Sequence, residues 1–134
     1  MRYGIDATTL LHVLDHDLPL DPSHQLVAPS TIRSEALGIL LADVRAGRRT
    51  EDDALALHER ITELKMRVLG DRVSRGTAWR LAREHDWPDL HDAEYLAVTR
   101  LQADALITVD PRLAKRVDDI VALAPVEALG QVSR

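Results

Sequence analysis

Short continuous apolar runs alternate along the chain with longer segments in which apolar residues recur every three or four positions. The runs at residues 2–6, 25–29, 105–109 and 120–126 are typical of strands that are buried on both faces of a sheet. The longer segments predict amphipathic helices. This alternation of strands and helices predicts an α/β fold with three α/β/α layers and a mostly parallel central sheet.

Capping residues delimit the helices of the first half. A helix over residues 8–14 follows the first strand. Ser30 is expected to cap a helix that ends at Gly47, and Thr50, followed by three acids, is expected to cap the next helix. These two helices are predicted to form a hairpin that protrudes as an arm. Residues 64–70 fit either a short strand or the end of the second helix.

The stretch from Asp89 to Asp110 organises the second half of the chain. It follows a helix predicted over residues 73–87, and it begins with a helix that has an apolar stripe at four-residue spacing. The stripe consists of Ala93, Ala97 and Leu101. The strand ALITV comes next, and it brings Asp110 to its carboxyl end, where open α/β sheets place their ligands. Pro111 then begins a short helix over residues 111–117.

Length and composition predict a single domain over residues 1–134. Of the 134 residues, 46% are hydrophobic and 29% are charged, which suits a globular domain with its own core. No apolar run approaches the roughly 18 residues that span a bilayer, and the start MRYGID lacks the apolar segment of a signal peptide. We therefore expect a cytoplasmic protein with no membrane partner. The absence of cysteine excludes disulfides, thiolate zinc sites and a cysteine nucleophile.

The net charge of −5 has the wrong sign for a simple nucleic-acid binder. It does not exclude nucleic acid, because carboxylates around a metal can hide a local basic rim. Two segments are dense in arginine. They contain Arg45, Arg48 and Arg49, and then Arg67, Arg72, Arg75, Arg80 and Arg83. These arginines fit either solvated helix faces and loops or such a rim.

Four acids lie where a parallel α/β fold can bring them together. Asp6 ends the first strand, Asp110 ends a later strand, and Glu35 and Asp92 lie early in helices. Several carboxylates cannot share a cavity at neutral pH without a cation, because like charges raise each other's pKa and oppose burial. Mg²⁺ or Mn²⁺ meets this need, since both prefer oxygen ligands and leave positions for phosphate oxygens. Such a site can activate water and stabilise the transition state of phosphodiester cleavage.

Each of these acids also has a purely structural interpretation. Asp110 fits the N-cap of the helix that follows it. Asp89 fits the N-cap of its own helix, with Asp92 at the third helical position, where the helix dipole favours an acid. Glu35 fits a solvated helix position, and Asp6 fits a cap of the first helix. The residue types alone leave both interpretations open.

Three segments resemble a PIN domain, and within that superfamily a VapC-type toxin, the endoribonuclease of a bacterial toxin–antitoxin pair. The segments are YGIDATTLL, VAPSTIRSEALGIL and HDAEYLAVTRLQADALITVDPRLA, and together they span nearly the whole chain in family order. The last is the most specific, with a D-A-x-Y-x-A helix followed by an apolar strand that closes in T-x-D. The acidic positions of the family fall on Asp6, Glu35, Asp92 and Asp110, and its hydroxyl positions fall on Thr8 and Thr108.

The resemblance implies a PIN-like fold and cleavage of RNA phosphodiester bonds that depends on Mg²⁺ or Mn²⁺. Asp6 and Asp92 would ligate the metal directly, with Asp110 beside them, and Glu35 would orient the metal-bound water or ligate through it. The threonines would hydrogen-bond these carboxylates. Asp89 is an extra acid near the site that we interpret mainly as the helix cap.

The resemblance also implies a homodimer and a cognate VapB-type antitoxin. The antitoxin peptide would offer an arginine to the acidic pocket, in a charge-assisted and bidentate pairing. The section from Arg45 to Arg83 resembles the family least. Within and beside it, Trp79 and Trp87 are interpreted as packing residues, with stacking on a nucleotide base as the alternative. His91 is expected to point away from the acids.

Four rival interpretations remain. A receiver domain would need paired acids after the first strand and a late lysine, whereas the late strand ends in Asp110. A haloacid-dehalogenase-type phosphatase would need D-x-D where this chain has Asp6-Ala7-Thr8. A non-catalytic PIN-like module that binds RNA or protein, and a stand-alone PIN nuclease without an antitoxin, are the stronger alternatives to a toxin.

Overall fold

Five parallel strands form the central sheet, in the order β3-β2-β1-β4-β5. The computed structural model describes residues 1–117 and 119–132. The strands are β1 (Arg2–Ile5), β2 (Gln25–Pro29), β3 (Met66–Leu69), β4 (Ala105–Ile107) and β5 (Leu123–Ala124). Every pairing of these strands is parallel, so the predicted α/β class with a parallel sheet is confirmed.

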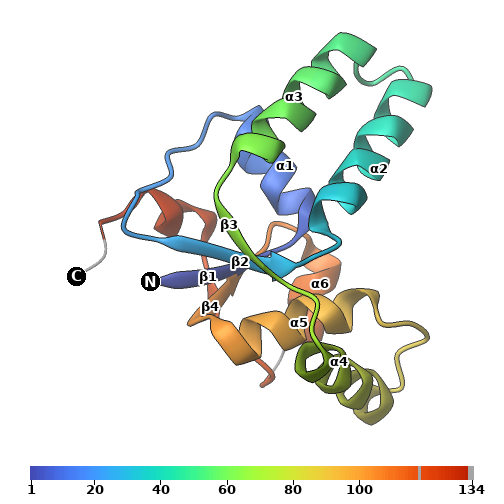
Figure 1. Cartoon of the computed structure of the whole chain (residues 1–134), viewed down its shortest axis with the longest axis vertical. Helices are drawn as coiled ribbons and strands as arrows, with labels where there is room; N and C mark the ends of the chain where they lie inside the picture. Colours follow the sequence, from blue (N-terminus) through green and yellow to red (C-terminus); the bar gives the residue numbers. More distant parts are fainter. Residues whose placement is uncertain (118, 133–134) are drawn as a thin grey trace.

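Helices cover both faces of the sheet and complete the three predicted layers. They are α1 (Ala7–Asp15), α2 (Ile32–Arg45), α3 (Glu51–Glu63), α4 (Arg72–His85), α5 (His91–Gln102) and α6 (Pro111–Val117), followed by the 3-10 helix η1 (Val126–Gly130). Helices α1, α2 and α3 lie on one face, and α4 and α5 lie on the other (Figure 1). None of the helices in the described part of the chain is long and apolar enough to cross a membrane.

The two faces of the sheet contribute to two separate hydrophobic cores. Ile5 and Ile107 pack into the larger core beneath α1, α2 and α3. Leu106 packs into the second core, with residues of α4, α5 and α6. Successive residues of a strand point to opposite faces, so strands covered by helices on both sides must be apolar throughout. This explains why the strands appear in the sequence as continuous apolar runs.

The chain reverses its direction of travel across the sheet between β1 and β4. From β1 it moves outward to β2 and β3, and it then crosses back to β4, which pairs with the other side of β1. The carboxyl ends of β1 and β4 therefore flank a topological switch point, where α/β sheets have room for a ligand. Asp6 follows β1, and Asp110 follows β4 by three residues.

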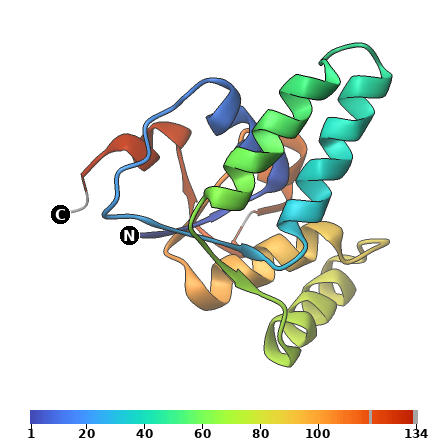
Figure 2. The ribbon, with the colours of Figure 1, turned by 45° about the horizontal axis from the view of Figure 1, so that its top comes forward.

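Helices α2 and α3 form the predicted hairpin. Thr50 caps α3 by accepting a hydrogen bond from the backbone N–H of Asp53, and Gly47 has a φ of +76° just after the end of α2. The pair projects beyond the sheet as an arm (Figure 2). Arg49 ties the loop of the arm to α1 through two hydrogen bonds to the carboxylate of Asp15, at 2.8 and 2.9 Å.

In the middle section, the structure decides one open prediction and corrects another. The undecided segment 64–70 contains β3, an edge strand that pairs with β2. The N-cap of α2 is Thr31, and not Ser30 as predicted. The backbone N–H of Ser30 instead donates to the carbonyl of Leu69, because the chain here still pairs with the end of β3.

Two predictions about the second half are wrong in part. The apolar stripe predicted for α5 includes Leu101, but this side chain is exposed in the last turn of the helix. The last predicted strand, residues 120–126, is only the two-residue β5. Pro125 follows β5 as the N-cap of η1, and the missing N–H of proline is consistent with the end of the strand here.

Gly4→Ala should destabilise the protein, because α5 lies directly on β1 at this position. A Cβ at Gly4 would lie 2.0 Å from Oγ1 and 3.0 Å from Cβ of Thr99. We expect a loss of about 2–3 kcal/mol in the free energy of unfolding, measured by urea denaturation. Gly38→Ala is the control. Its Cβ meets nothing within 4 Å in helix α2, so it should stabilise by about 0.5–1 kcal/mol. Equal effects of the two substitutions would contradict this account of the β1–α5 contact.

Candidate functional site

The four predicted acids line one cavity of about 510 Å³ at the carboxyl ends of β1 and β4. They come from four elements: Asp6 from the end of β1, Glu35 from α2, Asp92 from α5 and Asp110 from the turn before α6. The cavity also contains His91, Tyr95 and Arg112. The fold therefore brings together residues that are separated by up to 104 positions in the chain.

Asp6 is buried at the floor of this cavity, with 5% of its surface exposed. The hydroxyl of Thr9 donates to its Oδ1, and the hydroxyl of Thr108 also hydrogen-bonds it. Burial raises the pKa of the Asp6 carboxyl, the two hydroxyls oppose this rise, and the charge of Asp110 adds to it. Asp6 stands at the N-cap position of α1, but its side chain makes no capping hydrogen bond. The interpretation of Asp6 as a helix cap therefore holds for its position and not for its carboxylate.

The hydroxyl that supports Asp6 belongs to Thr9 rather than to Thr8. Thr8 is exposed on the wall of the cavity, whereas Thr9 is fully buried and also accepts a hydrogen bond from the backbone N–H of Val109 at 3.0 Å. The helix begins at Ala7, so the residue three positions after Asp6 turns back toward its carboxylate. Thr108 makes a contact with Asp6 of the kind predicted for it, and Thr9 makes the contact predicted for Thr8.

Glu35 is held by two side chains of α5. The hydroxyl of Tyr95 donates to Oε2 of Glu35, and Nε2 of His91 lies 2.5 Å from Oε1. Burial raises the pKa of Glu35 above its ordinary value, the contacts with Tyr95 and His91 oppose this rise, and the charges of Asp6 and Asp92 add to it. Glu35 is thus a bound residue of the cavity and not a solvated helix residue. The expectation that His91 points away from the acids is wrong.

Asp92 is paired with two arginines that the sequence analysis did not assign to the site. Arg112 binds it through both terminal nitrogens, and Arg116 lies 2.9 Å from its Oδ2. Only 3% of Asp92 is exposed. Burial alone would raise the pKa of this carboxyl, but the hydrogen bonds and charges of the arginines hold the pKa below its ordinary value. The spacing of four residues between these arginines on α6 was the available signal, since it places them on one helix face.

Asp110 and Asp89 both accept hydrogen bonds at helix starts. Oδ1 of Asp110 accepts from the backbone N–H of Arg112 at 2.9 Å, and Oδ2 lies 3.5 Å from its guanidinium. Oδ1 of Asp89 accepts from the backbone N–H of His91 at 3.0 Å. Asp89 is exposed and does not line the cavity. The expectation that Asp89 is the N-cap of α5, with Asp92 at the third helical position, is wrong, because the N-cap is Leu90 and the helix begins at His91. Asp110 combines the capping contact with a place in the cavity.

The donor set fits a hard divalent cation, although the present contacts do not hold one. Four carboxylates line the cavity, and the pKa of Asp6 and that of Glu35 are both raised, partly by the negative charge of neighbouring acids. A cation would remove this repulsion. Within residues 1–117 and 119–132, no three histidine or acidic side chains are arranged to hold a metal ion. The guanidinium groups on Asp92 and the Tyr95 contact of Glu35 engage oxygens that a metal would need.

The two tryptophans behave differently. Trp87 packs against the second core, stacks on His85 with ring centroids 4.9 Å apart, and lies beneath the guanidinium of Arg116 at 5.1 Å. Its interpretation as a packing residue is confirmed. Trp79 on α4 is 61% exposed, so the same interpretation is wrong for Trp79.

Comparison with known proteins identifies the fold. No protein-family model matches the chain, and no curated protein matches it. Among solved structures, the chain is similar to the crystal structure of PAE2754 from Pyrobaculum aerophilum, with a TM-score of 0.72 and 22% sequence identity. The similarity covers 96% of this chain and 95% of that chain. At this identity it shows the fold alone, and it agrees with the three-layer α/β/α arrangement.

Asp6→Asn should stabilise the metal-free protein at neutral pH. The folded-state pKa of Asp6 is raised, so the free energy of unfolding falls as pH rises from the ordinary pKa through the raised one. The asparagine variant avoids this loss. In EDTA at about pH 7 we expect a gain of about 1 kcal/mol, or about 3–5 °C in Tm, that shrinks as pH falls toward about 4.

Exposed Asp119 provides the matched control, since Asp119→Asn removes the same charge from the surface. Its Tm difference from the wild type should stay small and independent of pH. A variant Asp6→Asn that is less stable than the wild type at every pH would contradict the electrostatic account of the cavity.

Proposed function

We propose that the protein is an endoribonuclease that depends on Mg²⁺ or Mn²⁺ and acts as the toxin of a toxin–antitoxin pair. The observation that carries the proposal is the convergence of Asp6, Glu35, Asp92 and Asp110 in one cavity at the switch point of the sheet. A cation held there would supply an activated water and neutralise charge on a phosphodiester. The resemblance of the sequence to VapC-type toxins supports the choice of RNA as the substrate.

The side chains around the acids have positioning roles in this proposal. Thr9 and Thr108 orient the carboxylate of Asp6, and Tyr95 and His91 orient that of Glu35. Hydrogen bonds of this kind fix the direction of ligand oxygens and increase metal affinity. The elements that carry these residues are also held together, because α2, the side chain of Tyr95 and the ends of β1 and β4 all contribute to the larger core.

The contacts of Asp92 also support the predicted antitoxin. The acidic cavity already binds guanidinium groups, through the bidentate contact of Arg112 and the single contact of Arg116. An arginine from an antitoxin peptide would find the same chemistry at Glu35 and Asp110. We propose the homodimer and a VapB-type partner on the basis of the resemblance.

A second candidate function rests on the same ion pairs. Arg112 and Arg116 of the same chain neutralise the negative charge of Asp92. One of the four acids of the cavity therefore has its charge compensated without a metal. A non-catalytic module that binds RNA or protein fits this observation. The two functions differ in whether a divalent cation replaces the guanidinium of Arg112.

Purified protein freed of any antitoxin should cleave RNA only when Mg²⁺ or Mn²⁺ is added. Asp6→Asn and Asp110→Asn should each lower the cleavage rate about 100-fold or more, because each removes a charged oxygen donor from the cavity. Cleavage of a labelled RNA mixture, followed on denaturing gels, measures this, and Asp119→Asn is the control with unchanged activity. Cleavage in EDTA, or full activity in both cavity variants, would contradict the metal-dependent site.

Arg112→Ala should make the protein less stable without metal and more responsive to metal. Removal of one guanidinium from buried Asp92 should cost about 1–2 kcal/mol in EDTA, because Arg116 remains. Mn²⁺ should then raise the Tm of this variant more than that of the wild type, since the cation no longer competes with Arg112. Thermal unfolding with and without Mn²⁺ measures both effects.

The control for this experiment is Arg48→Ala, which breaks the exposed ion pair of Arg48 with Asp43. It should leave the Mn²⁺-dependent rise in Tm unchanged. If Mn²⁺ shifts the Tm of Arg112→Ala and the wild type equally, the metal does not reach Asp92, and the non-catalytic function gains support.

A further inference from the structure

Helix α4 has an exposed face that combines arginines with a tryptophan. Arg72, Arg75, Trp79 and Arg83 recur at three- and four-residue spacing, which places them on one side of the helix. Arg80 lies beside them, and all five side chains are exposed. The helix has four arginines and one glutamate, whereas the whole chain has a net charge of −5. We call these five residues the α4 surface.

The core does not need Trp79 for packing. The opposite side of α4 packs on α5 through small or branched residues, namely Ser74, Thr77, Ala78, Leu81 and Ala82. Trp79 leaves 61% of its surface in solvent, although an indole is one of the largest apolar groups available for burial. Trp87, by contrast, is packed between His85 and Arg116. Trp79 is therefore free to contact a partner.

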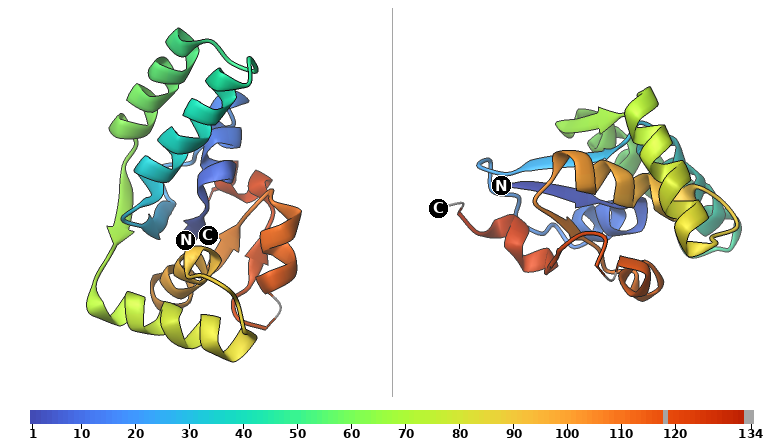
Figure 3. Two further views of the ribbon diagram at one scale, coloured as in Figure 1. Left: turned by 90° about the vertical axis from the view of Figure 1, so that its right-hand side faces the viewer. Right: turned by 90° about the horizontal axis from the view of Figure 1, so that it is seen from below.

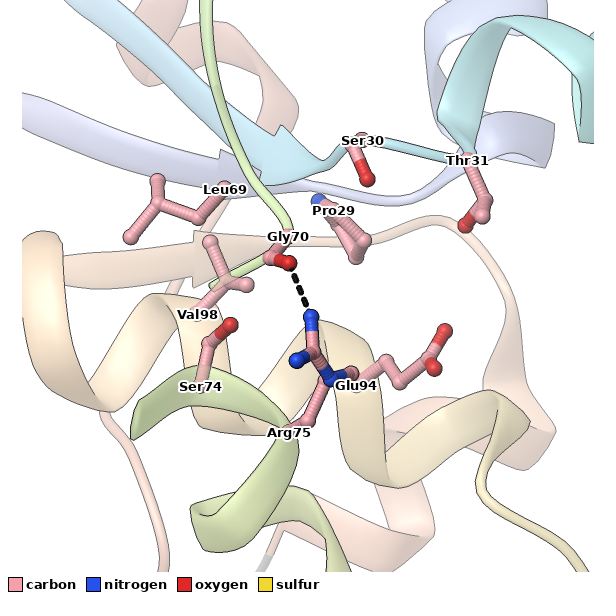
Figure 4. A pocket seen from close by; sticks show the side chains of 9 residues that line it. All are labelled: Pro29, Ser30, Thr31, Leu69, Gly70, Ser74, Arg75, Glu94 and Val98. Atoms are coloured by element: carbon pink, nitrogen blue, oxygen red, sulfur yellow. Dashed lines mark hydrogen bonds between the residues drawn. The ribbon is translucent and has the colours of Figure 1, made fainter. Parts of the chain in front are cut away.

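Helix α4 begins at the same edge of the sheet as the acidic cavity, because it follows the carboxyl end of β3. Helix α4 covers the outside of α5, far from the tip of the α2–α3 arm (Figures 1 and 3). Arg75 lines a second cavity, of about 170 Å³, at the carboxyl ends of β2 and β3 (Figure 4). Thr31 and Glu94 line this second cavity too, and they lie one turn or less from Glu35 and Asp92. The first turns of α2 and α5 thus border both cavities.

The charge and chemistry of the α4 surface select one kind of partner. A second copy of the chain, docked through the same face, would bring arginines against arginines, which is unfavourable. A polyanion is attracted instead, and an exposed indole offers a flat surface on which a base can stack. The combination of a basic stripe with an aromatic side chain is the usual means of binding single strands without sequence preference.

We propose that the α4 surface binds single-stranded RNA and holds a strand that extends from the acidic cavity. This inference rests on the proposed function for the identity of the nucleic acid. Trp79 stacks on a base, while Arg72 and Arg83 contact phosphates on either side. Arg75 is the residue of the α4 surface that also lines the second cavity, so a strand bound to this surface would pass from one cavity to the other beside it.

The test is binding of a labelled single-stranded RNA 20-mer, followed by fluorescence anisotropy in EDTA, so that cleavage does not interfere. Trp79→Ala should weaken binding about tenfold, and Trp79→Phe should restore most of the affinity, because stacking on one base contributes at this level. The double variant Arg72→Gln with Arg83→Gln should reduce the slope of log Kd against log salt by about 0.7 for each arginine.

Arg100→Gln is the matched control, since Arg100 is exposed near the end of α5, at the opposite edge of the sheet. It should leave both the affinity and the salt slope unchanged. Far-ultraviolet circular dichroism and Tm should match the wild type for every variant, because each altered side chain is exposed.

Three results would overturn the proposal. The first is wild-type protein that does not bind the RNA. The second is a Trp79→Ala variant that binds the RNA as tightly as the wild type. The third is a wild-type dimer that the Trp79→Ala substitution dissociates in sedimentation, because this would assign the surface to a second copy of the chain. Binding in EDTA that depends on Trp79 supports the α4 surface even if no cleavage follows when metal is added. Cleavage with binding that is indifferent to Trp79 supports the proposed function and overturns the surface.

Discussion

The ion pairs of Asp92 with Arg112 and Arg116 are the interactions on which the acidic cavity depends. A parallel sheet with a switch point between β1 and β4 gathers carboxylates at one edge, and burial makes their mutual repulsion costly. Two guanidinium groups from α6 neutralise the acid from α5. The acids from β1 and α2 keep raised pKa values. Burial and the neighbouring acids thus disfavour the charged forms of these two carboxyls, and a cation from outside would relieve this.

Helix α6 couples the strand ends to α5 through these pairs. Pro111 begins it immediately after Asp110, which accepts from the backbone N–H of Arg112. One turn later, Arg116 contacts both Asp92 and the ring of Trp87. A short helix with only two buried residues is thus fixed by polar contacts to the cavity. Displacement of Arg112 by a metal would change the position of a side chain without a change in the fold.

The fold and the four acids were predictable from the sequence, because both depend on local patterns. Continuous apolar runs indicate strands covered on both faces, and acids at the ends of such strands converge at a sheet edge. The supporting residues were harder to assign, because they depend on side-chain direction. Thr9, and not Thr8, hydrogen-bonds Asp6, because the first turn of α1 directs the third residue after Asp6 back toward its carboxylate. His91 of α5 contacts Glu35 of α2, and this contact depends on how the two helices are placed.

Contacts that depend on tertiary packing were missed for the same reason. Arg112 and Arg116 belong to a segment that fits an ordinary solvated helix, and only the position of α6 beside α5 reveals their partner. Trp79 was interpreted as a packing residue, with base stacking as the alternative, whereas α4 fills its buried side with alanine, serine, threonine and leucine. Leu101 continues the four-residue spacing of Ala93 and Ala97, but this spacing does not tell how far along the helix the buried stripe extends.

The central claim is that the four acids form a divalent metal site in competition with Arg112. A crystal structure of the protein soaked in Mn²⁺, with anomalous data collected at the manganese edge, tests it most directly. The account predicts one strong anomalous peak in the cavity beside Asp6 and Asp92, with the guanidinium of Arg112 turned away from the Asp92 carboxylate. A cavity without a peak at saturating Mn²⁺, with Arg112 still bound to Asp92, would contradict it.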